Sequence, residues 1–432
     1  MRPVAILATL LLATRACCAE TAPDAAAIKA AIERLGSDDF ADREAASDAL
    51  VKMGDPITPL LQSAIDKSHD AETRQRLETL VARWPVGGLV WKFEAGYVFG
   101  LPVVDGNRVY IGNKDMNFFC LDLESGKEIW KTPIEGMMFH SPAVADGRVY
   151  VIRTRKNGDP DGTLICLNAK DGSQLWTFHS TDSQTFTSPM VRDGKLYLVN
   201  DDVLFCLDAA TGKKLWEYQA PKTILSAPSI ADGWVLIGSL DHSIHCVSAE
   251  SGQHLWSYES GDSIYAGASI AKGRAYVGGN DKNVYCLDLK TGAKLWQYEG
   301  DGRIASAPAY ANERLYYGGD SGVVTCLNAA SGERVWEFKV TGMVTAAPSV
   351  FGSRVYFVAI YDRMTAFCLN ADDGKPLWSY SIKEAGYATP VLAGRRLLLG
   401  YCSSFYCVRT GAPGPDHWPM TGGNAARTGV GE

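Results

Sequence analysis

The chain has 432 residues, 46% of them hydrophobic and 21% charged, and a formal net charge of −7. This composition is typical of a soluble globular protein, and the length exceeds that of one ordinary compact core, so we expect several domains or a repeat architecture. The acidic balance argues against nucleic-acid binding, and no stretch after residue 20 is long and apolar enough to predict a transmembrane span.

Residues 1–19 have the pattern of a secretory signal peptide. Arg2 precedes an apolar run over residues 4–14, and the small residues of "RACCAE" follow it. Cleavage is expected after Ala16 or after Ala19. Cleavage after Ala16 would leave Cys17 at the N-terminus, where "TRAC" faintly resembles a bacterial lipoprotein box. We therefore expect an exported protein of the periplasm or cell envelope, with lipid anchoring at Cys17 as an alternative to a soluble form.

Residues 20–85 are predicted to form a small helical domain. The segment is rich in alanine and has a 3.6-residue period, and its first two helices are expected to end at Gly36 and Gly54. Two further short helices are expected before Trp84. The string "DDFADREAA…GDPITPLL" resembles a HEAT-like helical segment. A helical plug and a partner-binding arm are both open as its role.

Residues 88–411 contain a repeat. Seven copies of one string, such as "CLDLKTGAKLW" from Cys286 to Trp296, place a tryptophan ten residues after a cysteine. Successive tryptophans are 40 residues apart in four of seven steps, and 39, 46 and 42 apart in the others. Such a period indicates a solenoid or a propeller. Alternating Val, Ile, Tyr and Trp between glycine turns indicates strands.

One unit predicts one blade of a propeller. "TILSAPSIADG" (223–233), "WVLIGSLDHS" (234–243), "IHCVSAESG" (244–252) and "QHLWSYES" (253–260) form four strands joined by hairpins. The last unit has no proper fourth strand, and the strand around Trp91 has no blade before it. We therefore expect a mainly β protein, an eight-bladed β-propeller of four-stranded antiparallel blades preceded by a small α-helical domain, with the Trp91 strand closing the last blade. Residues 412–432 are a C-terminal tail.

The repeated string is interpreted as structural. Asp288 is expected to accept backbone N–H groups in an Asx turn, and Gly292 to supply the positive φ of a bulged hairpin. A tryptophan is a large flat side chain that can fill the gap between two blades. This inter-blade role is predicted for Trp91, Trp130, Trp176, Trp216, Trp256, Trp296, Trp336 and Trp378.

The cysteines repeat with the units. Equivalent positions in stacked units lie a whole unit apart, whereas a disulfide needs Cα atoms within about 7 Å. Cys120, Cys166, Cys206, Cys246, Cys286, Cys326, Cys368 and Cys407 are therefore expected to be small buried side chains. Cys402 could face Cys407 across a hairpin, so a disulfide between these two is an open alternative.

The motif D-x-x-[ST]-G-x-x-[LV]-W resembles the blade motif of the pyrroloquinoline-quinone-like (PQQ-like) propeller family over residues 88–410. The tail string "WPMTGGNAARTG" (418–429) is similar to the W-P-x-x-x-G-N-x-x-x-T-G element that usually precedes the first blade in this family. One branch of the family comprises quinoprotein dehydrogenases, which hold the quinone and a calcium ion in a central funnel. The other branch is non-catalytic and includes the propeller lipoprotein of the outer-membrane β-barrel assembly complex.

The chain departs from the dehydrogenase branch. Those enzymes have a vicinal cysteine pair beside the quinone, whereas the only adjacent pair here, Cys17–Cys18, lies in the signal segment. No calcium-binding set can be placed on matching positions, so no catalytic, cofactor-binding or metal residue is predicted. We expect a non-enzymatic binding scaffold of the cell envelope with protein partners and a role in outer-membrane protein assembly. A PQQ-dependent dehydrogenase with PQQ and calcium, and a glycan-binding propeller, are the alternatives.

One face of the ring is the predicted binding surface. The loops that lead into the innermost strands share this face and carry aromatic and charged residues. A mixed aromatic and charged rim suits protein or glycan binding, but the same aromatics could simply cap the core. The predicted surface consists of Tyr97, His140, Phe186, Tyr265, Arg303 and Tyr387.

Overall fold

The computed structural model describes two compact units. It covers residues 25–53, 61, 64–65, 68, 70–82, 89–96, 98, 100–154, 162–180, 186–361, 364–382, 391–393, 396–401 and 404–409. The first unit is Met1–Pro85 and the second is Val86–Glu432. The predicted signal segment, Cys17, Tyr97, Tyr387, Cys402 and the tail motif lie outside the described residues.

The first unit is helical. Its helices are α1 (Ala25–Arg34), α2 (Phe40–Met53) and α4 (Ala71–Ala82). Asp39 caps α2 by accepting the backbone N–H of Ala41 at 2.7 Å, and Asp70 caps α4 by accepting that of Thr73 at 2.7 Å. The helices share a small core that includes Ile28, Leu35, Ala46, Leu50, Leu61 and Leu77. The HEAT-like resemblance stays a prediction.

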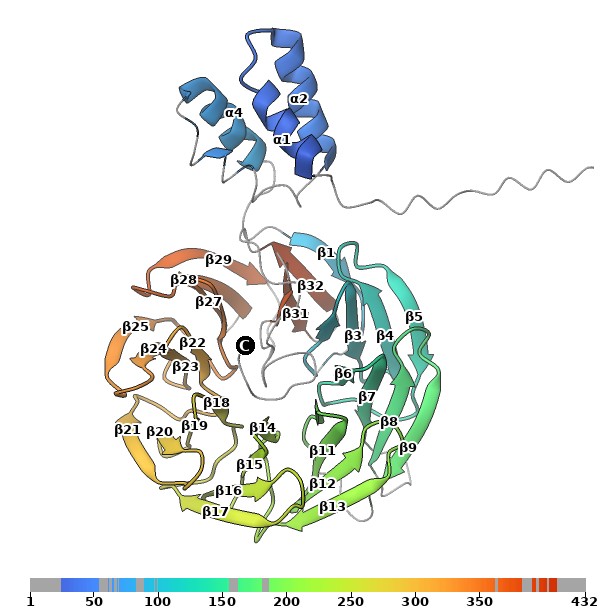
Figure 1. Cartoon of the computed structure of the whole chain (residues 1–432), viewed down its shortest axis with the longest axis vertical. Helices are drawn as coiled ribbons and strands as arrows, with labels where there is room; N and C mark the ends of the chain where they lie inside the picture. The colour runs from blue at the N-terminus through green and yellow to red at the C-terminus, as the bar shows by residue number, and fades with distance from the viewer. Residues whose placement is uncertain are drawn as a thin grey trace, which may run out of the picture. The chain divides into compact units, whose positions relative to one another are not determined.

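The second unit is an eight-bladed ring (Figure 1). Blades 1–7 follow each other along the chain, each with four antiparallel strands in sequence order. Blade 1 has β2–β5 (Val103–Asp105, Arg108–Gly112, Asn117–Asp122, Glu128–Pro133), blade 2 has β6–β9 (Ala143–Ala145, Arg148–Arg153, Thr163–Asn168, Gln174–His179), and blade 3 has β10–β13 (Met190–Arg192, Lys195–Asn200, Val203–Asp208, Lys214–Gln219). Blade 4 has β14–β17 (Ser229–Ala231, Trp234–Gly238, Ser243–Ser248, His254–Glu259), and blade 5 has β18–β21 (Ser269–Ala271, Arg274–Gly278, Asn283–Asp288, Lys294–Glu299). Blade 6 has β22–β25 (Ala309–Ala311, Arg314–Gly318, Val323–Asn328, Arg334–Lys339), and blade 7 has β26–β29 (Ser349–Phe351, Arg354–Ile360, Met364–Asn370, Pro376–Ile382).

Blade 8 joins the two ends of the ring. It has the order β1-β32-β31-β30, with β1 at Leu89–Phe93, β30 at Val391–Ala393, β31 at Arg396–Tyr401 and β32 at Ser404–Arg409. Strand β1 pairs antiparallel with β32, so that Trp91 lies opposite Cys407 and Phe93 opposite Phe405. The predicted fold class, an eight-bladed propeller of four-stranded antiparallel blades after a helical segment, is confirmed.

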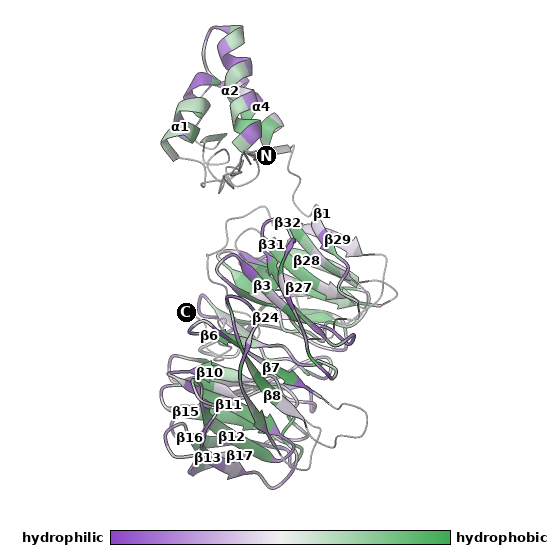
Figure 2. Cartoon of the chain, turned by 90° about the vertical axis from the view of Figure 1, so that its right-hand side faces the viewer, coloured by the Kyte–Doolittle hydropathy of each residue, from purple (hydrophilic) through white to green (hydrophobic). Residues whose placement is uncertain are grey.

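The blades bury their middle strands and expose their outer ones. The residues of β8 and β11 are almost all buried, whereas four of the six residues of β13 and of β21 are exposed. Figure 2 shows the hydrophobic colour concentrated in the strands inside the blades. Because both faces of each inner strand are covered by neighbouring blades, these strands are nearly continuous apolar runs.

A row of three side chains explains the repeated cysteine. In blade 5, Tyr276, Cys286 and Trp296 lie opposite each other on β19, β20 and β21. The Tyr276 and Trp296 ring centroids are only 6.0 Å apart. Alternate strands of a sheet are about 10 Å apart, so the rings lean toward each other over the middle strand. A small side chain is therefore needed beneath them. Tyr–Trp centroid distances of 5.8 to 6.0 Å recur in blades 1, 2, 3, 6 and 7.

The predicted Asx turn and bulge are confirmed. The Oδ1 atom of Asp288 accepts the backbone N–H groups of Lys290 and Thr291 at 3.1 and 2.8 Å, and the Thr291 hydroxyl at 2.8 Å. The β20–β21 register shifts between Cys286 and Leu287, which marks a β-bulge. The Thr291 hydroxyl, followed by the backbone N–H groups, lowers the pKa of the Asp288 carboxyl.

Each turn also receives the tryptophan of the preceding blade. Trp256 of blade 4 donates its indole N–H to the carbonyl oxygen of Leu289 in blade 5 at 3.1 Å. Gly292 has φ of +72°, and a Cβ atom there would lie 2.5 Å from the Trp256 ring. The glycine is thus required twice, by its backbone angle and by the ring stacked on it. We call this contact the tryptophan–glycine clasp.

The clasp recurs around the ring. A Cβ atom would lie 2.5 to 2.7 Å from a tryptophan ring at Gly126 (Trp91), Gly172 (Trp130), Gly212 (Trp176), Gly252 (Trp216), Gly332 (Trp296) and Gly374 (Trp336). Indole N–H groups also donate to the turn carbonyls of Leu123, Ala169, Ala249, Ala329 and Ala371, from Trp91, Trp130, Trp216, Trp296 and Trp336 respectively. The structure thus places these tryptophans between neighbouring blades.

We predict that Gly292→Ala lowers the free energy of unfolding by about 2–4 kcal/mol, because a strained φ of about 1 kcal/mol adds to the overlap with Trp256. Gly273→Ala is the matched control. Gly273 has φ of +70°, but nothing lies within 4 Å of its added Cβ. Its loss should be only about 1 kcal/mol. Urea denaturation measures both, and equal losses would show that the clasp contributes nothing.

We predict that the repeated thiols do not react in the folded protein. Burial raises the pKa of Cys286 to about 12 and that of Cys120 to about 11. Cys120, Cys166, Cys206, Cys246, Cys286, Cys326 and Cys368 are free thiols and buried. At pH 8 an alkylating reagent should label their peptides only after denaturation, as read by mass spectrometry. Labelling of any of the seven in the native protein would contradict their burial.

We predict that the Asx turns make stability sensitive to acid. Hydroxyl hydrogen bonds from Thr211 and Thr291 lower the pKa of Asp208 and Asp288 below the ordinary value of an aspartate. A lowered native pKa gives stability that is present above the unfolded value and lost as the pH falls through the native one. The double variant Asp208→Asn, Asp288→Asn keeps an acceptor without a titrating group. Urea denaturation should therefore show a smaller difference in the free energy of unfolding between wild type and variant at pH 3 than at pH 7. A difference that is the same at both pH values would contradict this role.

Candidate functional site

The predicted binding residues lie on loops that lead into different blades. His140 lies before β6, Phe186 before β10, Tyr265 before β18 and Arg303 before β22. Tyr265 is 41% exposed and Arg303 is also exposed, while His140 is half-buried. Phe186 is 4% exposed and packs in the core with Leu198. Phe186 therefore caps the core, and the other described residues stay a predicted surface.

A polar network in blade 4 combines acid, histidine and hydroxyl groups. Asp241 lies 2.8 Å from Nε2 of His245, whose Nδ1 lies 2.9 Å from the Ser257 hydroxyl. Ser257 also lies 2.7 Å from Nε2 of His254. Both ring nitrogens of His245 are therefore occupied by groups of the same blade. The network fastens the turn before β16 to β16 and β17, and His245 is buried within it.

Among the described residues, no group of three or more His, Cys, Asp or Glu side chains is placed to hold a metal ion. The repeated thiols have raised pKa values because they are buried, so they are poor nucleophiles and poor ligands.

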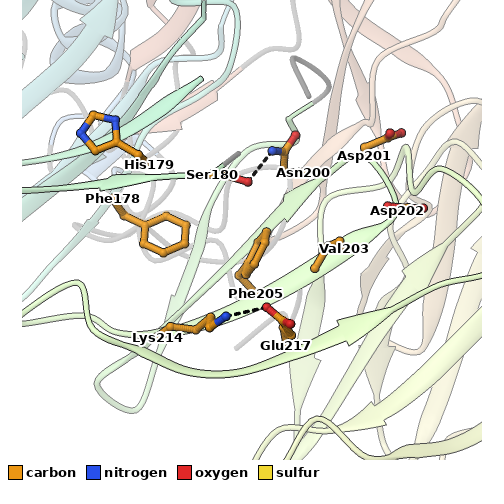
Figure 3. Close-up of a pocket in the computed structure, with 10 residues that line it drawn as sticks. All are labelled: Phe178, His179, Ser180, Asn200, Asp201, Asp202, Val203, Phe205, Lys214 and Glu217. Carbon is orange, nitrogen blue, oxygen red and sulfur yellow. Dashed lines mark hydrogen bonds and ion pairs between the residues drawn. The ribbon is translucent and has the colours of Figure 1, made fainter. Parts of the chain in front are cut away.

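A hollow of about 510 Å³ opens between blades 2 and 3 (Figure 3). Blade 2 contributes the end of β9, and blade 3 contributes the β11–β12 turn and part of β12 and β13. The Phe178 and Phe205 rings pack edge to face with centroids 5.6 Å apart. Its lining comprises Phe178, His179, Ser180, Asn200, Asp201, Asp202, Val203, Phe205, Lys214 and Glu217.

Polar groups surround these two rings. Asn200 is 3% exposed and donates from Nδ2 to the Ser180 hydroxyl at 2.5 Å. Lys214 pairs with Glu217 at 2.8 Å on the outer strand. Asp201 accepts a hydrogen bond from the Thr223 hydroxyl at 2.7 Å. An apolar floor with a few convergent polar groups is the usual composition of a binding pocket.

Sequence reasoning did not find this hollow. Its residues belong to strands and a turn that the repeat pattern assigns to structure. The signal available was the Asp201-Asp202 turn, which is one residue shorter than the turns of the next two blades. The short turn alone does not predict a hollow, because the opposite wall is β9 of the preceding blade.

Comparison with known proteins relates the chain to outer-membrane assembly factors. A family model described as "Outer membrane protein assembly factor BamB" matches residues 78–198, 160–306 and 280–404. The chain is similar to BamB of Escherichia coli (strain K12), with 30% identity over 118 residues that make up 27% of this chain and 28% of the relative. It is also similar to BamB of Burkholderia pseudomallei (strain K96243), with 33% identity over 95 residues, 22% of this chain and 23% of that one. The matched part is thus about a quarter of each relative's length.

Solved structures share the fold. The crystal structure of BamB from Moraxella catarrhalis superimposes with a TM-score of 0.63 at 17% identity, covering 75% of this chain and all of that one. A quinohemoprotein alcohol dehydrogenase, ADHIIG from Pseudomonas putida HK5, has a TM-score of 0.58 at 15% identity. The match covers 76% of this chain and 78% of the dehydrogenase chain. At such identities both matches show the fold alone.

The three matched segments of the family model overlap and together run from before β1 to the start of β32. They therefore include residues of all eight blades. The chain belongs to the PQQ-like propeller family whose model is described as outer membrane protein assembly factor BamB.

Proposed function

We propose that this chain is a non-enzymatic binding scaffold of the cell envelope that takes part in outer-membrane protein assembly. The family match along the whole ring carries the proposal. The curated relatives from Escherichia coli and Burkholderia pseudomallei are named as assembly factors, which supports protein partners for this chain.

The proposed location is the periplasm or the cell envelope. The support is the charged start, apolar run and small-residue exit of residues 1–19, with lipid anchoring at Cys17 as one form of attachment. No helix in the described part of the chain has the length and apolar character to cross a membrane.

The dehydrogenase alternative is not favoured. Its support is the likeness to the alcohol dehydrogenase, which at 15% identity concerns the fold alone. Binding of PQQ with Ca²⁺ by the purified full chain, together with dye-linked oxidation of an alcohol or sugar, would contradict the non-enzymatic part of the proposal.

We predict that deleting the gene in the bacterium that carries it lowers the amounts of β-barrel proteins in the outer membrane. The physical reason is the loss of a binding surface on which these chains or their assembly machinery depend. Quantitative mass spectrometry of outer-membrane fractions measures the effect, and the full-length chain should restore the wild-type amounts.

A shortened chain separates the contributions of the two units. A chain without residues 21–84 should restore the outer-membrane proteins if the propeller alone carries the function, and should fail if the helical unit is the partner-binding arm. Unchanged outer-membrane proteins in the deletion strain would contradict the proposed role itself.

A further inference from the structure

The hollow between blades 2 and 3 differs from the equivalent places at the next two junctions. At each junction, an aromatic residue two positions after the outer-strand tryptophan meets an aromatic residue of the following blade. These pairs are Phe178–Phe205, Tyr218–His245 and Tyr258–Tyr285, at centroid distances of 5.6, 6.1 and 5.4 Å. An aromatic pair is therefore present at each of these three junctions, and the side chains determine whether the space beside each aromatic pair is filled.

Polar atoms close the two later junctions. His245 bonds Asp241 through Nε2, and Tyr218 places its hydroxyl 3.3 Å from Nδ1 of the same ring. The Tyr285 hydroxyl donates to Asp281, which also accepts the backbone N–H of Gly261 at 2.8 Å. The turn aspartates at these junctions are thus satisfied inside the protein.

The junction between blades 2 and 3 has no such closure. Phe178 and Phe205 have no polar atom to offer to the turn. The turn is also shorter, because Asn200 pairs with Val203 across two residues, whereas Ser239 and Ser243 enclose three. The turn of blade 3 is therefore one residue short, and the space stays open over the two phenylalanine rings.

A buried acceptor is left without a partner in this space. Oδ1 of Asn200 is buried and accepts no hydrogen bond, while its Nδ2 is used by Ser180. Asn113, at the same place in blade 1, uses both ends of its amide: Oδ1 accepts the Asn117 N–H at 2.8 Å and Nδ2 donates to Ala95. An unpaired buried acceptor is destabilising, so Asn200 is a position where a ligand donor is favoured.

The charges around the hollow point to a cationic donor. Asp201, Asp202 and Glu217 contribute three carboxylates, against one lysine ammonium from Lys214, which is already paired with Glu217. Within the described part of the chain, the Asp202 side chain takes part in no ion pair and the Asp201 carboxylate bonds only to the Thr223 hydroxyl. The hollow therefore combines an aromatic floor with an excess of acceptors.

We propose that this hollow binds the guanidinium group of an arginine side chain presented by a partner polypeptide. A guanidinium carries five N–H donors in one plane, stacks on aromatic rings and has no acceptor to conflict with the carboxylates. Its alkyl stem lies on Phe178 and Phe205, and its donors reach Asn200 Oδ1 and Asp202. The inference rests on the proposed function, because it gives the chemistry by which a partner protein is recognised.

A glycan is the competing ligand. Sugar hydroxyls are donors and acceptors in equal measure, and they do not need the excess of carboxylates found here. We therefore assign the site to the cation and use sugars as one arm of the test.

The experiment titrates the full-length protein with a blocked Gly-Gly-Arg-Gly-Gly peptide and follows binding by ligand-observed NMR. A single anchored side chain should bind with a dissociation constant of roughly 1 mM or below. The same peptide with citrulline, which keeps the shape but not the charge, should bind at least about fivefold more weakly. n-Butylguanidinium carries the guanidinium and an alkyl stem without a polypeptide or a second charge, and it should bind more weakly than the peptide if a partner chain is the source.

Two variants and one control locate the site. Asp202→Asn should weaken peptide binding about fivefold by removing one carboxylate. Phe205→Tyr should abolish peptide binding. The new hydroxyl can donate to a turn carboxylate and fill the hollow, as the Tyr285 hydroxyl donates to Asp281 in blade 5. Asp301→Asn makes the same charge change in an exposed loop before blade 6 and should leave binding unchanged. Unaltered thermal unfolding verifies that the variants fold.

Each outcome decides the inference. Equal binding of the citrulline peptide overturns the cation, equal binding of n-butylguanidinium overturns the polypeptide source, and absence of binding by every probe overturns the site. An oligosaccharide that binds and is blocked by Phe205→Tyr would reassign the hollow to glycans. None of these results changes the outer-membrane protein amounts of the deletion strain, so failure here is separable from failure of the assembly role.

Discussion

The stacking of a tryptophan on the turn glycine of the next blade is the contact on which the ring depends. A blade is a small sheet with two apolar faces, and it is stable only when both are covered by its neighbours. The tryptophan–glycine clasp fixes this contact at the outer edge, since Trp256 covers Gly292 and donates its N–H to Leu289. The Asx turn of Asp288 shapes the loop that receives the ring. The turn from Asp288 to Gly292 therefore serves both the strand pairing inside one blade and the packing between two blades.

Packing between blades explains why the glycine, cysteine and tryptophan positions of the repeat are uniform while other positions vary. Glycine, cysteine and tryptophan recur because each is confined by a neighbour: Gly292 by the Trp256 ring, and Cys286 by the Tyr276–Trp296 pair. Two positions after Trp176, Trp216 and Trp256 the side chains are less uniform. There the chain has Phe178, Tyr218 and Tyr258 with different partners, and the junction is open or closed accordingly. Binding specificity can vary at these junctions without loss of the ring.

Closure by β1 has a consequence for how the fold is held together. Strand β1 and strand β32 come from opposite ends of the propeller, and their pairing joins Trp91 to the Cys407 row of blade 8. Trp91 then clasps Gly126 of blade 1. The contacts that complete blade 8 therefore have the largest sequence separation in the unit, and loop-closure entropy makes them the most costly to form.

Short-range sequence patterns were enough to predict the parts of this protein that depend on neighbouring residues. The Cys–Trp spacing, the turn chemistry of Asp288 and Gly292, and the missing fourth strand of the last unit predicted the blade, the hairpins and an eight-bladed ring. Contacts between residues far apart in the chain became visible only in the folded ring: the Trp256 ring lies on Gly292, two rings meet above the small Cys286 side chain, and Phe186 fills the core. The hollow between blades 2 and 3 belongs to the same class. It arises from a turn one residue shorter and from two phenylalanines on different blades, and the space they leave has no signature in the sequence because its walls are about 20 to 40 residues apart in the chain.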